Sequence, residues 1–184
     1  MVQIRGDFKE ELPPTCEYLR LSFSPNPGVT LEERWENNKL SADFLGHYFA
    51  TFLPDSDKAR IRAATTYVVN ELLENAIKHN QDIINYPIDL SVHLYTDLVV
   101  FVITNTTSVD SVKRLYVFID DLIRLGPEKL FEINVNTDDG GSGLGFVIMA
   151  KDYKVKLGWR LEPIQQDLEV IKVTTMAQLP LPIS

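Results

Sequence analysis

One segment of the sequence, Tyr67–Asn80, constrains the fold most, because it predicts a helix with two chemically different faces. At about 100° per residue, its apolar residues fall within an arc of roughly 140°. Positions three and four apart stack on a helix, so the polar side chains form a row on the other side. The apolar set is Val69, Leu72, Leu73, Ala76 and Ile77, and the polar row is Glu71, Asn75, Lys78 and His79.

This polar row suits an anionic ligand that carries a divalent cation. Amide and carboxylate oxygens bind such a metal, an ammonium group attracts phosphate, and a carboxylate accepts a proton from water or a hydroxyl. The same spacing is also typical of a surface helix with a solvated polar face. The spacing alone leaves both interpretations open, so the identities of the residues have to decide between them.

The composition predicts one globular domain with a full hydrophobic core. The chain has 184 residues, of which 45% are apolar and 24% charged, which is ordinary for a soluble domain. A net charge of −8 argues against nucleic acid and anionic membranes as main partners. The longest apolar run, Leu98–Ile103, is too short to span a bilayer. Charges at Arg5, Asp7 and Lys9 do not suit a signal peptide, and the expected compartment is the cytoplasm.

The rest of the chain alternates between strand and helix patterns. A capping box at Thr30 and Glu33 predicts a helix that ends before Pro54, and Asp55 or Ser56 is expected to cap the next one. Ser108 or Asp110 begins a later helix, and Thr96–Asp97 is a two-residue hairpin turn. Strands are expected at Tyr18–Phe23, Ile88–Leu94, Leu98–Ile103, Lys154–Leu161 and Leu168–Gln178.

An aromatic stripe on the first helix is expected to be buried in the core. A surface for a homodimer or another partner is the alternative interpretation. The stripe consists of Trp35, Phe44, Leu45, Tyr48, Phe49 and Phe52.

A glycine-rich segment, Gly141–Gly145, leads straight into an apolar helix at Phe146–Asp152. Glycines before a helix let backbone N–H groups and the helix dipole meet phosphate oxygens. A flexible linker is the alternative, although a linker would not run directly into an apolar helix. The glycine spacing matches neither the dinucleotide fingerprint nor the P-loop.

Together, the segment from Glu71 to His79 and the glycine segment resemble the N-box and G2 box of the GHKL ATPase superfamily. Its members include histidine-kinase catalytic domains, gyrase-type ATPases, Hsp90 and anti-sigma-factor kinases. Glu71 with Asn75 is most similar to the anti-sigma-factor serine/threonine kinases of bacterial partner-switching systems. The resemblance covers about Tyr18 to Pro182. It implies a single two-layer α/β sandwich with a mixed, mostly antiparallel sheet, helices on one face, an N-terminal arm at 1–17 and a lid at 106–140.

The resemblance also implies ATP and Mg²⁺ as cofactors and a set of site residues. Asn75 would be the metal ligand, and Glu71 would be the base that accepts a proton from a substrate hydroxyl. Lys78 and His79 would lie beside the phosphates, and Asn105 with Thr174 or Thr175 would lie at the adenine end. The backbone at Gly141, Gly143, Leu144 and Gly145 would approach the phosphate chain.

One motif of the superfamily is missing. The G1 box, Asp-x-Gly-x-Gly, should follow the strand Leu98–Ile103, but the sequence there reads Thr104-Asn105-Thr106-Thr107. Asn105 accepts a hydrogen bond without the assistance of a charge. The favoured function is an ATP-dependent kinase that acts on a small regulatory protein, either an antagonist or a sigma-factor-like partner. A degenerate GHKL module that only binds its partner is the alternative. A third, less favoured alternative is a doubly wound nucleotide-binding domain with a strand at Phe131–Val135.

Overall fold

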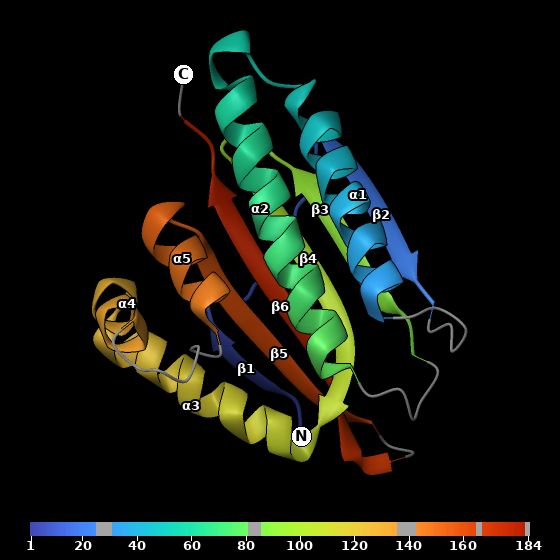
Figure 1. Ribbon diagram of the computed structural model, residues 1–184, viewed down its shortest axis with the longest axis vertical. Coiled ribbons are helices and arrows are strands. Elements are labelled where there is room, and N and C mark those ends of the chain that lie inside the picture. The colour runs from blue at the N-terminus through green and yellow to red at the C-terminus, as the bar shows by residue number, and fades with distance from the viewer. Residues whose placement is uncertain (25–30, 81–85, 136–142, 165–166, 183–184) are drawn as a thin grey trace.

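The computed structural model describes residues 1–24, 31–80, 86–135, 143–164 and 167–182. Within these ranges the chain forms six strands and five helices (Figure 1). In chain order they are β1 (Gln3–Gly6), β2 (Glu17–Phe23), α1 (Leu31–Ala50), α2 (Asp55–His79), β3 (Ile88–Leu94), β4 (Leu98–Ser108), α3 (Val109–Leu125), α4 (Pro127–Val135), α5 (Leu144–Asp152), β5 (Lys156–Ile164) and β6 (Asp167–Pro180).

The strands form one sheet in the order β1-β5-β6-β4-β3-β2, and each neighbouring pair in it is antiparallel. The helices lie on one face of this sheet (Figure 1). The predicted two-layer α/β sandwich is therefore confirmed. The doubly wound alternative is wrong, because such a fold needs parallel strands and because Phe131–Val135 belongs to helix α4.

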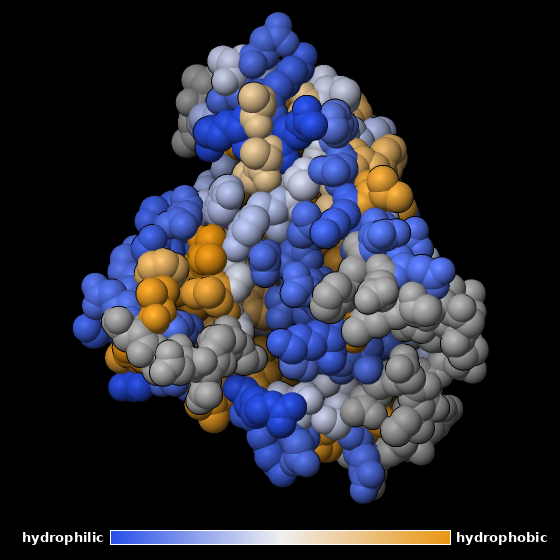
Figure 2. All heavy atoms as spheres, in the orientation of Figure 1, coloured by the Kyte–Doolittle hydropathy of each residue, from blue (hydrophilic) through white to orange (hydrophobic). Residues whose placement is uncertain are grey.

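Helix α2 packs against α1 and against strand β4. Its predicted apolar face is buried, apart from the half-buried Ile77. The sheet contributes Phe101, Ile103 and Trp159 to the same core. Figure 2 shows that the helix-covered side of the molecule is largely hydrophilic, with apolar residues gathered over α4 and α5.

The aromatic stripe of α1 is only partly buried. Leu45 and Phe49 are buried, whereas the side chains of Phe44 and Phe52 are about half exposed. The rings of Phe44 and Phe52 lie 5.8 and 5.4 Å from the ring of Tyr48. The expectation that the whole stripe is buried was wrong, because only one side of α1 faces α2. Phe44, Tyr48 and Phe52 are four residues apart, so they form a second row on a different side from Leu45 and Phe49.

The predicted helix ends are correct at α3 and wrong at α2. Ser108 caps α3 by accepting a hydrogen bond from the Ser111 amide. Helix α2 has Pro54 at its cap position and no side-chain cap bond, so neither Asp55 nor Ser56 acts as the cap. Thr30 of the expected capping box lies outside the described residues.

Strand β4 is longer than its apolar run. The residues Thr104–Thr107 do not form a loop; they continue the strand and pair with residues 171–174 of β6. β-branched threonines suit a pleated strand, and this explains why pairing continues after the apolar residues end. The region 106–140 expected to be a lid therefore begins within β4, and its described part continues through α3 and α4.

Residues 7–16, here called the N-terminal strap, cross the sheet face that the helices leave uncovered. The strap begins after β1, where the Gln178 side chain donates to the carbonyl of Asp7. A Cβ at Gly158 would collide with the backbone of Phe8, so glycine permits this close crossing. At the far end, Tyr95 donates to the carbonyl of Pro13. The strap therefore covers part of the open face.

In the part of the chain that is described, no helix combines the length and the apolar character that a membrane span requires.

The two sides of α1 give a stability prediction. Phe49→Ala should lower the free energy of unfolding by about 3–5 kcal/mol, because it leaves a cavity between α1 and α2. Phe44→Ala, the matched control on the same helix, should lower it by about 1 kcal/mol or less. Urea denaturation followed by circular dichroism measures both changes, and equal losses would contradict the burial of Phe49.

Candidate functional site

A cavity of about 80 Å³ lies between α2, α3 and the sheet, next to the start of α5. Strands β4, β5 and β6 form its floor. These elements bring together residues that are up to a hundred positions apart in the sequence. The polar residues that line it are Asn75, His79, Asn105, Thr107, Ser111, Arg114 and Thr175.

The cavity contains several of the residues that the sequence pointed to. Asn75 and His79 reach it from α2, Asn105 from β4, and Gly143 from the turn before α5. The side chain of Asn105 is buried, and its Nδ2 donates to the carbonyl of Thr106 over 3.2 Å. The structure thus places the polar row of α2 beside one end of the glycine segment.

Glu71 and Gly145 do not line this cavity. Glu71 lies on α2 one helical turn before the lining residue Asn75, directly against Gly145. A Cβ at Gly145 would overlap the Glu71 carboxylate, so the two residues are in direct contact and a larger residue at 145 requires the Glu71 side chain to move. Burial raises the pKa of Glu71, the charge of Glu74 adds to this, and a hydrogen bond from the Tyr67 hydroxyl opposes it. A half-buried carboxylate with a raised pKa is a better proton acceptor than an exposed one.

Asn75 has one amide atom engaged by the helix backbone. Its Nδ2 donates to the carbonyl of Glu71 over 2.7 Å. This leaves the oxygen Oδ1 as the acceptor or metal-ligand atom. Among the described residues no group of three or more His, Cys, Asp or Glu could hold a metal ion. A Mg²⁺ ion here would therefore be held by Asn75 together with ligand phosphates rather than by a protein cage.

The remaining predicted residues do not line the cavity. Lys78 is exposed, and Leu144 is half-buried at the first turn of α5. Gly141 lies outside the described residues. Thr174 faces the opposite side of the sheet, where its hydroxyl lies 3.1 Å from that of Thr104. Its neighbour Thr175 lines the cavity instead, because successive residues of a strand point to opposite faces.

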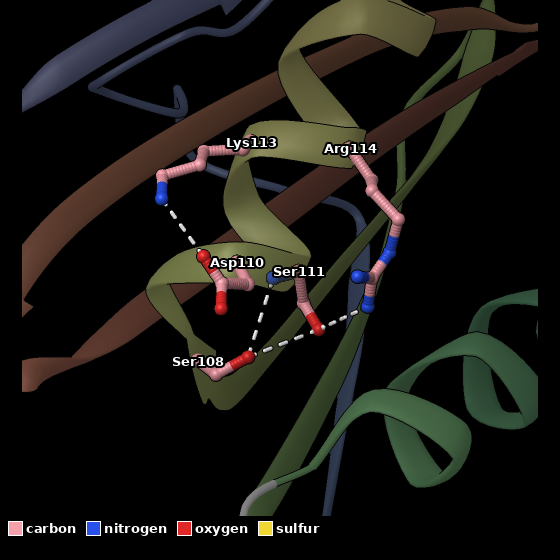
Figure 3. A network of polar contacts seen from close by, with 5 residues as sticks. All are labelled: Ser108, Asp110, Ser111, Lys113 and Arg114. Carbon is pink, nitrogen blue, oxygen red and sulfur yellow. Dashed lines mark hydrogen bonds and ion pairs between the residues drawn. The ribbon is translucent and has the colours of Figure 1, made fainter.

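Arg114 is a cavity residue that the sequence analysis missed. Its guanidinium donates to the Ser111 hydroxyl over 2.9 Å, and the Ser111 hydroxyl lies 3.1 Å from that of the cap residue Ser108 (Figure 3). The three residues repeat every three positions along a helix whose start had been predicted. That spacing is the signal that could have placed Arg114 beside Ser111.

The charge of Arg114 acts on His79. Burial lowers the pKa of His79, and the nearby charges of Lys78 and Arg114 lower it further. The imidazole is therefore neutral near pH 7. A bound anion would offset these positive charges and favour the protonated imidazole.

Aromatic rings form the inner wall of the cavity. The rings of Phe118 and Trp159 meet edge to face, with centroids 6.4 Å apart. Two polar atoms among the lining residues, Trp159 Nε1 and Thr107 Oγ1, are buried without a hydrogen-bond partner. Unpaired buried polar atoms are costly in native proteins, so this end of the cavity is suited to a polar ligand or to water.

The comparisons with known proteins show a shared fold. No family model and no curated protein matches the sequence. The structure is similar to a chain in a crystal structure of the SiaB–SiaC complex from Pseudomonas aeruginosa. The TM-score is 0.57 over 88% of this chain and 89% of that chain, with 13% sequence identity. At this identity the similarity concerns the fold alone.

The contact between Glu71 and Gly145 gives a double-mutant prediction. Gly145→Ala should lower the free energy of unfolding by about 1–3 kcal/mol, because the new methyl group overlaps the carboxylate. In a Glu71→Ala background the same change should be neutral or stabilising by up to about 1 kcal/mol, since alanine favours the helix over glycine. An equal cost in both backgrounds, measured by thermal unfolding, would show that the two residues do not touch.

The raised pKa of Glu71 gives a pH prediction. Its protonated form is favoured in the folded state, so the stability it contributes is present below its ordinary pKa of 4.5 and lost as the pH rises through the folded value. Glu71→Gln mimics the protonated form and should raise the free energy of unfolding at pH 7, with the gain disappearing at about pH 4. Glu36→Gln, on the exposed side of α1, is the control and should change it by about 0.5 kcal/mol or less at either pH.

Proposed function

We propose that this chain is a GHKL-type regulatory domain that binds ATP with Mg²⁺ in the cavity between α2 and α3. It transfers the γ-phosphate to a serine or threonine hydroxyl of a small regulatory partner protein. The observation that carries this proposal is the arrangement of Asn75, Gly143 and Glu71. Asn75 and Gly143 line one cavity, and Glu71, one helical turn before Asn75 on α2, lies against Gly145, two residues after Gly143.

Glu71 is the proposed base. The partner's hydroxyl oxygen bonds to the γ-phosphorus while the bond from the γ-phosphorus to the bridging oxygen breaks, and the proton passes to the Glu71 carboxylate. The raised pKa of Glu71 supports this role, because the carboxylate holds a proton more readily than an exposed one. A residue that only bound a partner would not need a half-buried carboxylate, which has a desolvation cost.

The other cavity residues supply binding. Asn75 Oδ1 is the proposed ligand of Mg²⁺, which when bound neutralises the charge of the phosphates. Gly143, in the left-handed conformation with φ of 94°, precedes helix α5 and lines the cavity. The N–H groups and dipole of a helix start attract phosphate, and Arg114 adds a positive charge.

The regulatory part of the proposal is supported by the fold comparison. The similar structure is a complex between two proteins, SiaB and SiaC. A regulatory role that depends on binding a partner protein is consistent with that similarity. The resemblance to anti-sigma-factor kinases narrows the expected partner to a small antagonist or a sigma-factor-like protein.

A second candidate function is a non-catalytic module that regulates by binding its partner. The observation that favours it is the cavity volume of about 80 Å³, which is well below the roughly 300–1,000 Å³ of ordinary small-molecule pockets. The rings of Phe118 and Trp159 also line this small cavity. Kinase activity requires α3 to move away from α2 when nucleotide enters.

Two substitutions separate these functions. Glu71→Gln should leave ATP affinity within about two-fold. It should lower phosphotransfer to the regulatory partner protein by about 10²–10⁴-fold, the usual contribution of a positioned base. Asn75→Ala should weaken nucleotide binding itself, and only when Mg²⁺ is present, because a metal ligand is lost. Calorimetric titration with ATP, with and without Mg²⁺, and transfer of a labelled γ-phosphate are the measurements.

Matched controls come from the exposed side of α1. Glu36→Gln and Asn37→Ala repeat the two chemical changes away from the cavity and should alter neither quantity. If the wild-type chain binds no ATP at millimolar concentration, the kinase function is wrong. If partner binding is then indifferent to Glu71→Gln and Asn75→Ala, the binding module is the function.

A further inference from the structure

A second and larger hollow lies on the opposite face of the sheet, beside the N-terminal strap. Its volume is about 570 Å³. It crosses five neighbouring strands, from β5 through β6, β4 and β3 to β2. Thr104 and Thr174 lie at its centre, with Arg160 and Lys172 toward one end and Arg20 toward the other. This hollow is here called the open-face groove.

The lining of the groove carries more cations than carboxylates, although the chain has a net charge of −8. Its lining includes the cations Arg20, Arg160 and Lys172 and one carboxylate, Asp89. Arg20 pairs with Asp89 over 3.1 Å. At the other end, Lys172 and Arg160 share the single carboxylate of Glu162, at 2.9 and 3.7 Å. Among the residues that the structure describes, these two cations therefore have one carboxylate between them.

Polar groups along the groove are available for binding. The Nε atom of Arg160 is buried and has no hydrogen-bond partner. The hydroxyls of Thr104 and Thr174 bond only to one another among the described side chains. Both hydroxyls retain acceptor capacity. The groove thus offers hydrogen bonds as well as charge.

The length of the groove fits an extended peptide. Five adjacent strands span four intervals of about 4.8 Å, or roughly 19 Å, which is the length of about six extended residues. The strap is a precedent within this chain, because it crosses the same sheet face as an extended segment. It is held there through its backbone, with the Lys9 amide 3.5 Å from Met176 Sδ and the Asp7 carbonyl accepting from Gln178.

We propose that the open-face groove binds an extended acidic segment, about six residues long, of a protein partner. The segment lies beside the strap, with carboxylates near Arg20 at one end and near Arg160 and Lys172 at the other. Between these two ends, small or hydroxyl-bearing residues of the segment lie over Thr104 and Thr174. This docking site is on the opposite face from the nucleotide cavity, so it depends on neither ATP binding nor Glu71.

A peptide titration tests the proposal. The probe is an acetylated, amidated hexapeptide of sequence Asp-Glu-Thr-Thr-Glu-Asp, added to the full isotope-labelled chain without nucleotide and followed by NMR. The amide signals of Thr104 and Thr174 should shift. Lys172→Gln should weaken the peptide's affinity about two- to five-fold, which corresponds to the loss of one exposed ion pair. Glu162 keeps its pairing with Arg160 in this variant. Lys113→Gln, at an exposed ion-paired lysine of α3, is the matched control and should change nothing.

Four results would overturn the proposal. The first is the absence of shifts at Thr104 and Thr174 with millimolar peptide. The second is equal binding of a hexapeptide that carries lysines in place of the acidic residues. The third is the same shifts with inorganic phosphate, which would make the groove a small-anion site. The fourth is the same shifts on concentrating the chain alone, which would make a second copy the occupant.

Discussion

The packing of α2 against the sheet and α1 is the interaction on which the rest of the structure depends. Val68, Leu72 and Ala76 are buried along one side of this helix. The helix cannot rotate without exposing them, and each buried aliphatic side chain contributes about 1.5–3 kcal/mol. Hydrophobic packing therefore fixes the direction of the polar side. It holds Asn75 in the cavity and Glu71 against Gly145.

Some of the buried polar groups in and near the cavity destabilise the fold. Glu71 is a half-buried carboxylate with a raised pKa, and Trp159 Nε1 and Thr107 Oγ1 lack partners. Buried groups without compensation destabilise a fold, and they are tolerated where a ligand or a reaction uses them. On α3, the serines of the helix cap hold Arg114 beside the cavity. The same local hydrogen bonds thus cap the helix and position the positive charge of Arg114 at the cavity.

The sheet separates two surfaces of different character. Its helix side holds a small cavity with aromatic walls, and its open side holds a broad groove with cations at both ends. Alternation along the strands makes this separation sharp, because Thr174 and Thr175 are adjacent in sequence and face opposite sides. The strap leaves only part of the open face accessible. Ligands of the cavity and of the groove would therefore lie on opposite sides of the sheet.

The sequence by itself determined the features that depend on short-range pattern. The period of Val69, Leu72 and Ala76 predicted the buried side of α2, and alternation predicted β3. Capping preference narrowed the start of α3 to Ser108 or Asp110, of which the structure uses Ser108. Tertiary structure alone decided which side of α1 is covered, that pairing with β6 extends β4 through Thr107, and that the strap crosses the open face. It also brought Arg114 and Thr175 to the cavity. Periodicity records which residues share a face, whereas contact between faces depends on how separate elements pack, and that requires the whole chain.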